Sequence, residues 1–128
     1  MLIDTDVLIW FTRGHAGAAT RLQSIQPWRI SAITYMELVQ GCRNQQEHAR
    51  IKQGLAQRGT VVVPMNSTIS ERAVQLIDRY ALSHGLQAAG ALIAATAMEL
   101  ELTLLSANAK HFAFIEGLAF ERFMPEPA

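Results

Sequence analysis

Three acidic or amide side chains lie near the ends of segments that we expect to form buried strands. Asp4 follows the first apolar run, Glu37 lies in the helix after the second expected strand, and Asn108 follows a later one. Carboxylates brought close together repel each other, so such a cluster is favourable only with a cation between them. Oxygen ligands of this kind suit Mg²⁺ or Mn²⁺ rather than zinc.

Each of these residues also has a purely structural interpretation. Asp4 is well placed to cap a helix, and Asp6 fits a second cap or an exposed acid in the first helical turn. Glu37 fits a solvated helix position, and Asn108 fits a turn. The four histidines are scattered without the spacing of metal ligands. The chemical hypothesis therefore depends on the elements that would bring these residues together.

Short apolar segments alternate with helical patterns along the whole chain. The expected strands are residues 1–3, 29–31, 60–63, 102–105 and 118–123, and the expected helices are residues 7–11, 18–25, 36–41, 45–57, 67–83 and 87–100. We expect 60–63 to be a buried strand and 112–115 a short turn. This alternation predicts a parallel sheet that helices cover on both faces. In such sheets functional groups collect at the carboxyl ends of the strands.

Composition limits the class of protein. A chain of 128 residues that is 50% hydrophobic fits one domain with a real core. Eleven basic residues balance eleven acidic ones, which excludes a strongly basic nucleic-acid wrapper but not a local basic face. One cysteine excludes an internal disulfide framework, no apolar run approaches a membrane span, and the first residues lack a signal peptide's basic region. We therefore expect a cytoplasmic protein.

Four segments occur in an order that points to a known family. They are LIDTDVLI (residues 2–9), ISAITYMELVQG (30–41), ALIAATA (91–97) and LLSANAKHF (104–112). Together they resemble the PIN-domain ribonucleases and, within that family, the VapC-type toxins of toxin–antitoxin pairs. The resemblance covers nearly the whole chain.

The resemblance implies a three-layer α/β/α sandwich around a mostly parallel sheet, with residues 1–128 forming a single PIN domain. It implies Mg²⁺- or Mn²⁺-dependent cleavage of RNA, a homodimer, and inhibition by a cognate antitoxin protein. Asp4, Glu37 and Asn108 match family positions that bind metal and support catalysis. Ser106 and Asp6 match less strictly. Lys110 is the basic residue nearest in sequence to the site and is our candidate for RNA binding.

One position departs from the family pattern. An aspartate normally precedes the ALIAATA segment, and Gly90 takes its place here. Glycine also disfavours a helix by up to about 1 kcal/mol relative to alanine. Natural loss of activity, deliberate disabling of a toxin, and a drifted copy with residual function would each account for Gly90. We expect the chain to be nearly inactive as an endoribonuclease.

Two alternatives stay open. A PIN domain without catalysis would act as a module that binds RNA or an antitoxin. The Asp4-Thr5-Asp6 opening also resembles haloacid-dehalogenase-like phosphatases, in which Asp4 would be the nucleophile and Asp6 the acid and base. Those enzymes need a lysine and a later acidic pair for Mg²⁺, and Asp78 is the only later aspartate.

Overall fold

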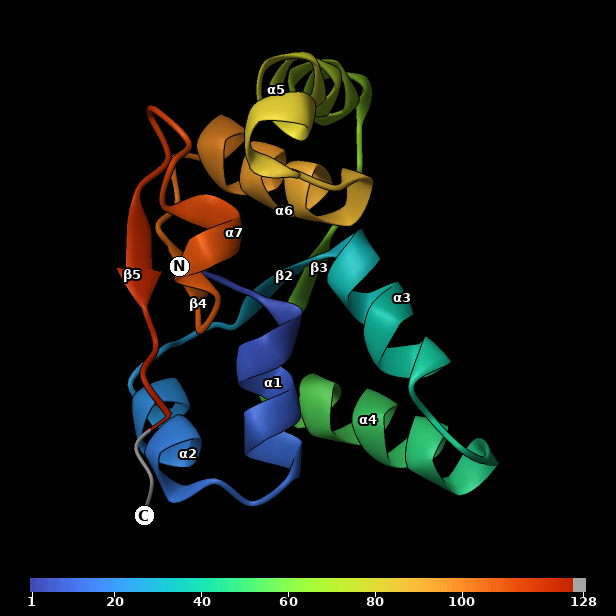
Figure 1. Ribbon diagram of the computed structural model, residues 1–128. Coiled ribbons are helices and arrows are strands. Elements are labelled where there is room, and N and C mark those ends of the chain that lie inside the picture. Colours follow the sequence, from blue (N-terminus) through green and yellow to red (C-terminus); the bar gives the residue numbers. More distant parts are fainter. Residues whose placement is uncertain (126–128) are drawn as a thin grey trace.

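The computed structural model describes residues 1–125, so the last three residues of the expected domain lie outside it. Strands and helices alternate through the described residues (Figure 1). The elements are β1 (Leu2–Ile3), α1 (Thr5–Thr12), α2 (Ala16–Gln23), β2 (Arg29–Ser31), α3 (Ala32–Gln40), α4 (Gln45–Gln57), β3 (Val61–Val63), α5 (Ser67–His84), α6 (Ala88–Glu99), β4 (Leu104–Ser106), α7 (Ala109–Phe112) and β5 (Phe120–Arg122).

The five strands form one sheet in the order β3-β2-β1-β4-β5, and all neighbours are parallel. The chain proceeds outward from β1 through β2 to β3, then crosses to the other side of β1 to form β4 and β5. The strand order therefore reverses between β1 and β4. Open α/β sheets bind their ligands in the crevice outside the carboxyl ends of the strands at such a reversal.

Alternating residues of the central strands pack into two separate hydrophobic cores. Leu2 and Leu104 pack with α5 and α6, whereas Ile3 and Leu105 pack with α1 and α2. Successive side chains of a strand point to opposite faces, which produces this division. Figure 1 shows α5 and α6 on one side of the sheet and α1, α2 and α4 on the other. The predicted α/β/α sandwich is confirmed.

The central helix α6 is apolar on almost every side, as its alanine-rich sequence predicts. Its Ala91, Ala94, Ala95 and Ala97 are fully buried. No helix in the described part of the chain is both long enough and apolar enough to cross a membrane.

One local prediction was wrong, and one short helix was not predicted. Val61 and Val62 of β3 are 46% and 41% exposed, because β3 is an edge strand rather than a buried one. The turn predicted over 112–115 is present at residues 113–114, but the short helix α7 just before it, over residues 109–112, was not predicted. Phe112 at the end of α7 is buried in the core with α5 and α6, so its packing stabilises α7.

Candidate active site

The reversal between β1 and β4 brings together residues from opposite ends of the chain. Asp4 follows β1, and its backbone N–H donates a hydrogen bond to the Leu105 carbonyl at 2.9 Å. The next residue of β4 is Ser106, which is fully buried. Asp4 also caps α1, because its Oδ1 accepts a hydrogen bond from the Thr5 backbone N–H at 2.8 Å. The cap interpretation of Asp4 is thus correct, and it leaves Oδ2 directed at β4.

A serine hydroxyl lies between two carboxylates at this crevice. Ser106 Oγ donates to Asp4 Oδ2 at 2.7 Å and lies 3.4 Å from Asp6 Oδ2. Asp6 Oδ2 also accepts a hydrogen bond from the Ala107 backbone N–H at 3.1 Å. Asp6 is therefore not an exposed first-turn acid: it is half-buried and bound to the segment that follows β4.

Burial disfavours the charged forms of both carboxyl groups, and the charge of Asp6 further disfavours the charged form of Asp4. The pKa of Asp4 is raised to about 7, first by burial and then by the charge of Asp6, against the opposing hydrogen bonds from Ser106 and Thr5. Burial also raises the pKa of Asp6, and the Ala107 N–H opposes that rise. A nearby cation would favour ionisation of both groups.

Glu37 reaches the same region from α3. Thr5 Oγ1 donates a hydrogen bond to Glu37 Oε1 at 2.6 Å and lies 3.1 Å from the Thr34 hydroxyl. Thr34 is fully buried, so it fixes the position of the Thr5 hydroxyl. Our sequence reasoning missed Thr5 as a residue that orients Glu37. Its place between Asp4 and Asp6 was the only available signal.

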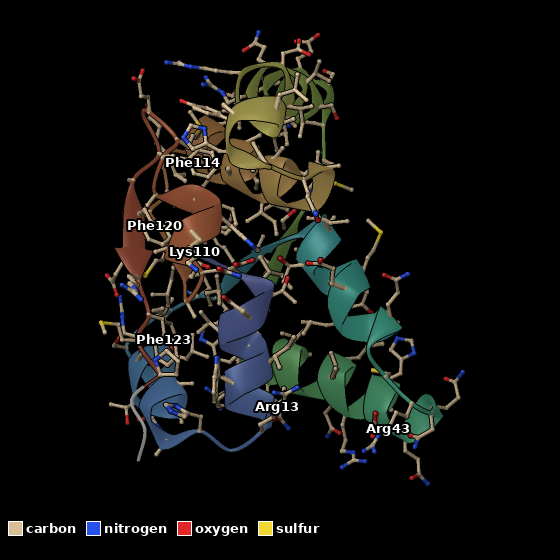
Figure 2. All side chains as sticks on the ribbon, in the orientation of Figure 1. Arg13, Arg43, Lys110, Phe114, Phe120 and Phe123 are labelled. Atoms are coloured by element: carbon tan, nitrogen blue, oxygen red, sulfur yellow. The ribbon has the colours of Figure 1, made fainter. Side chains whose placement is uncertain are left out.

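Asn108 and Lys110 lie on the other side of the crevice, at α7. The Asn108 backbone N–H donates to Ser106 Oγ at 3.0 Å, so Asn108 helps to orient that hydroxyl. Its side chain is half-exposed and makes no hydrogen bond with the described residues. Lys110 is exposed on α7 (Figure 2). The roles of both side chains toward metal and RNA stay predictions.

Gly90 lies in the first turn of α6, in a position that accepts a larger side chain. A Cβ added there would lie 3.4 Å from Leu86 Cδ1 and 3.8 Å from Phe112 Cε1, which are close to ordinary contact distances. Gln87 at the start of α6 makes no side-chain cap hydrogen bond. An acidic residue in this first turn would be favoured by the helix dipole. No local packing requirement therefore explains the glycine.

The residues present provide a small set of oxygen ligands for a divalent cation. Within residues 1–125, no three His, Cys, Asp or Glu side chains are arranged to hold one ion. The four ion pairs of this region also leave out Asp4, Asp6 and Glu37. Buried carboxylates without a basic partner fit a cation, and Mg²⁺ commonly uses one or two carboxylates and retains several waters. The donor set thus fits Mg²⁺ or Mn²⁺.

A groove of about 940 Å³ lies beside this crevice, between α1, α3 and α4. Apolar side chains such as Leu8, Leu38 and Leu55 line it, and Glu37 lies in its wall. Four arginines also line the groove: Arg13, Arg43, Arg50 and Arg58. Figure 2 shows Arg13 at the end of α1 and Arg43 at the turn between α3 and α4. Sequence reasoning missed this groove, because its residues come from three helices and form no motif.

Comparison with known families agrees with this geometry. The model of the PIN domain family matches residues 1–117, which include Asp4, Asp6, Glu37 and Asn108. This chain belongs to the PIN domain family. The match spans every strand of the sheet except β5, so it includes the crevice between β1 and β4.

Proteins similar to this PIN domain include a ribonuclease and chains of toxin–antitoxin complexes. Ribonuclease VapC10 from Mycobacterium tuberculosis is 36% identical over 122 residues, which cover 92% of this chain and 90% of that protein. A toxin–antitoxin complex from Klebsiella pneumoniae contains a chain with 30% identity and a TM-score of 0.80, covering 99% and 98% of the two chains. The DNA-bound VapBC of Salmonella typhimurium shares the fold, with a TM-score of 0.82, 20% identity and coverage of 94% and 96%. The expected resemblance to VapC-type PIN-domain ribonucleases is confirmed.

Proposed function

We propose that this PIN domain is a metal-dependent endoribonuclease and the toxin of a type II toxin–antitoxin pair, impaired by Gly90. The observation that carries this proposal is the convergence of Asp4, Asp6 and Ser106 at the strand reversal, with Glu37 held nearby through Thr5. Family membership and the similarity to ribonuclease VapC10 support the choice of RNA as substrate.

Each residue of the crevice would have a separate role in the reaction. Asp4 and Glu37 would hold the cation, and the Asn108 amide oxygen is a further candidate ligand. Mg²⁺ or Mn²⁺, when bound, supplies Lewis-acid activation of water and of the phosphate. Ser106 orients Asp4, Thr5 orients Glu37, and Lys110 would contact an RNA phosphate.

An antitoxin segment is the occupant that fits the neighbouring groove. Its apolar lining suits apolar anchor residues, and its arginines suit an acidic segment. Arg58 lies over the rings of Phe11 and Trp28, at 5.2 and 4.8 Å, which holds its charge in place. Because Glu37 lies in the groove wall, a bound segment would also obstruct the active site. The expected homodimer and cytoplasmic location stay predictions.

Gly90 also supports a second candidate function, a catalytically inactive PIN domain that binds RNA or an antitoxin. Removing one electrostatic contributor from an active site commonly costs on the order of 10²–10³ in rate. A chain that has lost one metal-binding carboxylate can retain its fold and its groove. The two functions differ in what a carboxylate restored at position 90 would do.

The decisive variant is Gly90→Asp, assayed for RNA cleavage with Mg²⁺, with Mn²⁺ and with EDTA. We expect cleavage to rise by on the order of 10²–10³ over the parent chain and to disappear in EDTA. Gly90→Asn is the matched control, because it adds a similar volume without the charge. If Gly90→Asp gains no more than Gly90→Asn while binding of the antitoxin persists, the binding-module function is correct instead.

A further inference from the structure

The position of Asp6 is unusual for an acid in the first turn of a helix. The side chains of such residues commonly interact favourably with the positive end of the helix dipole while remaining in solvent. Asp6 instead lies against the end of β4, with Oδ2 3.1 Å from the Ala107 nitrogen and 3.4 Å from Ser106 Oγ. The Asp6 carboxylate therefore lies close to the Ser106 hydroxyl, which donates a hydrogen bond to Asp4.

One hydroxyl proton cannot serve two carboxylates. Ser106 Oγ lies 2.7 Å from Asp4 Oδ2, so its proton is directed to Asp4 rather than to the more distant Asp6. Ser106 Oγ also accepts the Asn108 N–H, which further fixes its orientation. Asp6 accepts hydrogen bonds from the Ala107 and Val7 backbone N–H groups, shares a hydrogen bond with the Asp4 carboxyl, and forms no ion pair within residues 1–125. A cation is the partner that would balance the two adjacent charges.

The charge of the site gives Asp6 a particular role in this chain. Gly90 stands where the family resemblance implies a carboxylate, and Asn108 contributes a neutral amide, which leaves Asp4 and Glu37 as the charged family positions. Asp6 adds a negative charge directly beside Asp4, so these two carboxylates could share one cation, although no three His, Cys, Asp or Glu side chains of residues 1–125 are arranged to hold one ion. The number of charged ligands is a main determinant of cation affinity in oxygen-ligand sites.

We propose that Asp6 is a ligand of the divalent cation and compensates for the carboxylate that is absent at position 90. This inference rests on the proposed nuclease function and refines its metal site. The competing interpretation is that Asp6 only anchors the segment after β4 through the Ala107 N–H. Asp6→Asn separates the two, because its amide oxygen still accepts that N–H while the negative charge is lost.

The experiment measures Mn²⁺ affinity of the purified chain by electron paramagnetic resonance, without RNA. We expect Asp6→Asn to weaken Mn²⁺ binding about tenfold or more. Asp78→Asn is the charge-matched control on the exposed face of α5 and should change the affinity less than about twofold. Circular dichroism melting checks that each variant is folded.

A double variant tests compensation directly. If Asp6 substitutes for the missing carboxylate, the loss caused by Asp6→Asn should be smaller in the Gly90→Asp background than in the parent chain. Equal Mn²⁺ affinity of Asp6→Asn and the parent would overturn the inference and leave the nuclease proposal standing. Absence of Mn²⁺ binding in both the parent and Gly90→Asp would overturn the proposed metal site itself.

Discussion

The crevice at the β1–β4 reversal and the groove between α1, α3 and α4 are adjacent but opposite in character. The crevice is acidic and partly buried, and Asp4 is only 6% exposed there. The groove is open, apolar in its lining and bordered by arginines. Glu37 belongs to both. The contrast fits our proposal that the crevice performs the chemistry and that the groove binds an antitoxin segment, which would obstruct the crevice at Glu37.

The largest effect should come from removing the charge of Asp4. In the Gly90→Asp background, Asp4→Asn should lower RNA cleavage by on the order of 10²–10³, because asparagine keeps the helix cap but binds a cation poorly. Binding of the cognate antitoxin should stay within about twofold of the Gly90→Asp parent. A parallel loss of both activities would show that the two regions are not separable.

The same residue gives a stability test of the crevice. In EDTA, folded Asp4 has a pKa of about 7, against its usual value near 3.8 when unfolded. The folded chain therefore binds the proton more tightly, and stability falls as pH rises from about 4 to about 7. Asp4→Asn should remove this loss, stabilising the chain by on the order of 4 kcal/mol at pH 8 and little at pH 4. Urea unfolding at both pH values measures the change in the free energy of unfolding that Asp4→Asn causes. Equal increases in stability at the two pH values would contradict the account.

Substitution of Arg58, which lines the groove, should change the affinity for the antitoxin and not the cleavage of RNA. Arg58→Ala should weaken binding of the cognate antitoxin about tenfold, with a larger loss at low salt. Cleavage by the Gly90→Asp chain should not change. Arg122→Ala removes an exposed charge on β5, outside the groove, and serves as the control. Similar losses from both substitutions would mean that only net charge matters.

The smallest effect concerns Lys110 at the rim of the crevice. Lys110→Ala should raise the KM for RNA about threefold and leave kcat nearly unchanged, because a single exposed phosphate contact contributes about 1 kcal/mol or less. Lys52→Ala, on the exposed surface of α4, is the control. Steady-state kinetics of the Gly90→Asp chain provide the measurement, and a change in kcat alone would place Lys110 in the chemistry instead.

The sequence predicts the layers of this fold well, because strand and helix periods are local properties. The alanine-rich run at 91–97 and the alternation of apolar segments lead directly to a buried α6 and a parallel sheet. Strand order is not a local property. The exposure of Val61 and Val62 follows from the edge position of β3, which no local pattern reveals.

The residues of the candidate site could be proposed from the sequence, but their contacts could not. The family pattern identifies Asp4 and Glu37, yet spacing alone makes Asp6 an ordinary acid of a first helical turn. Its contact with Ala107, 101 residues away in the chain, exists because β4 lies beside β1. The link from Thr5 to Glu37 likewise depends on how α1 packs against α3. Such contacts arise from tertiary packing.

Anomalous diffraction from Gly90→Asp crystals soaked in Mn²⁺ tests the central claim most directly. We expect a Mn²⁺ peak at the carboxyl ends of β1 and β4, within about 2.5 Å of an Asp4 carboxylate oxygen, and no such peak in crystals that also carry Asp4→Asn. A Mn²⁺ site elsewhere in the molecule, with an empty crevice, would contradict the account.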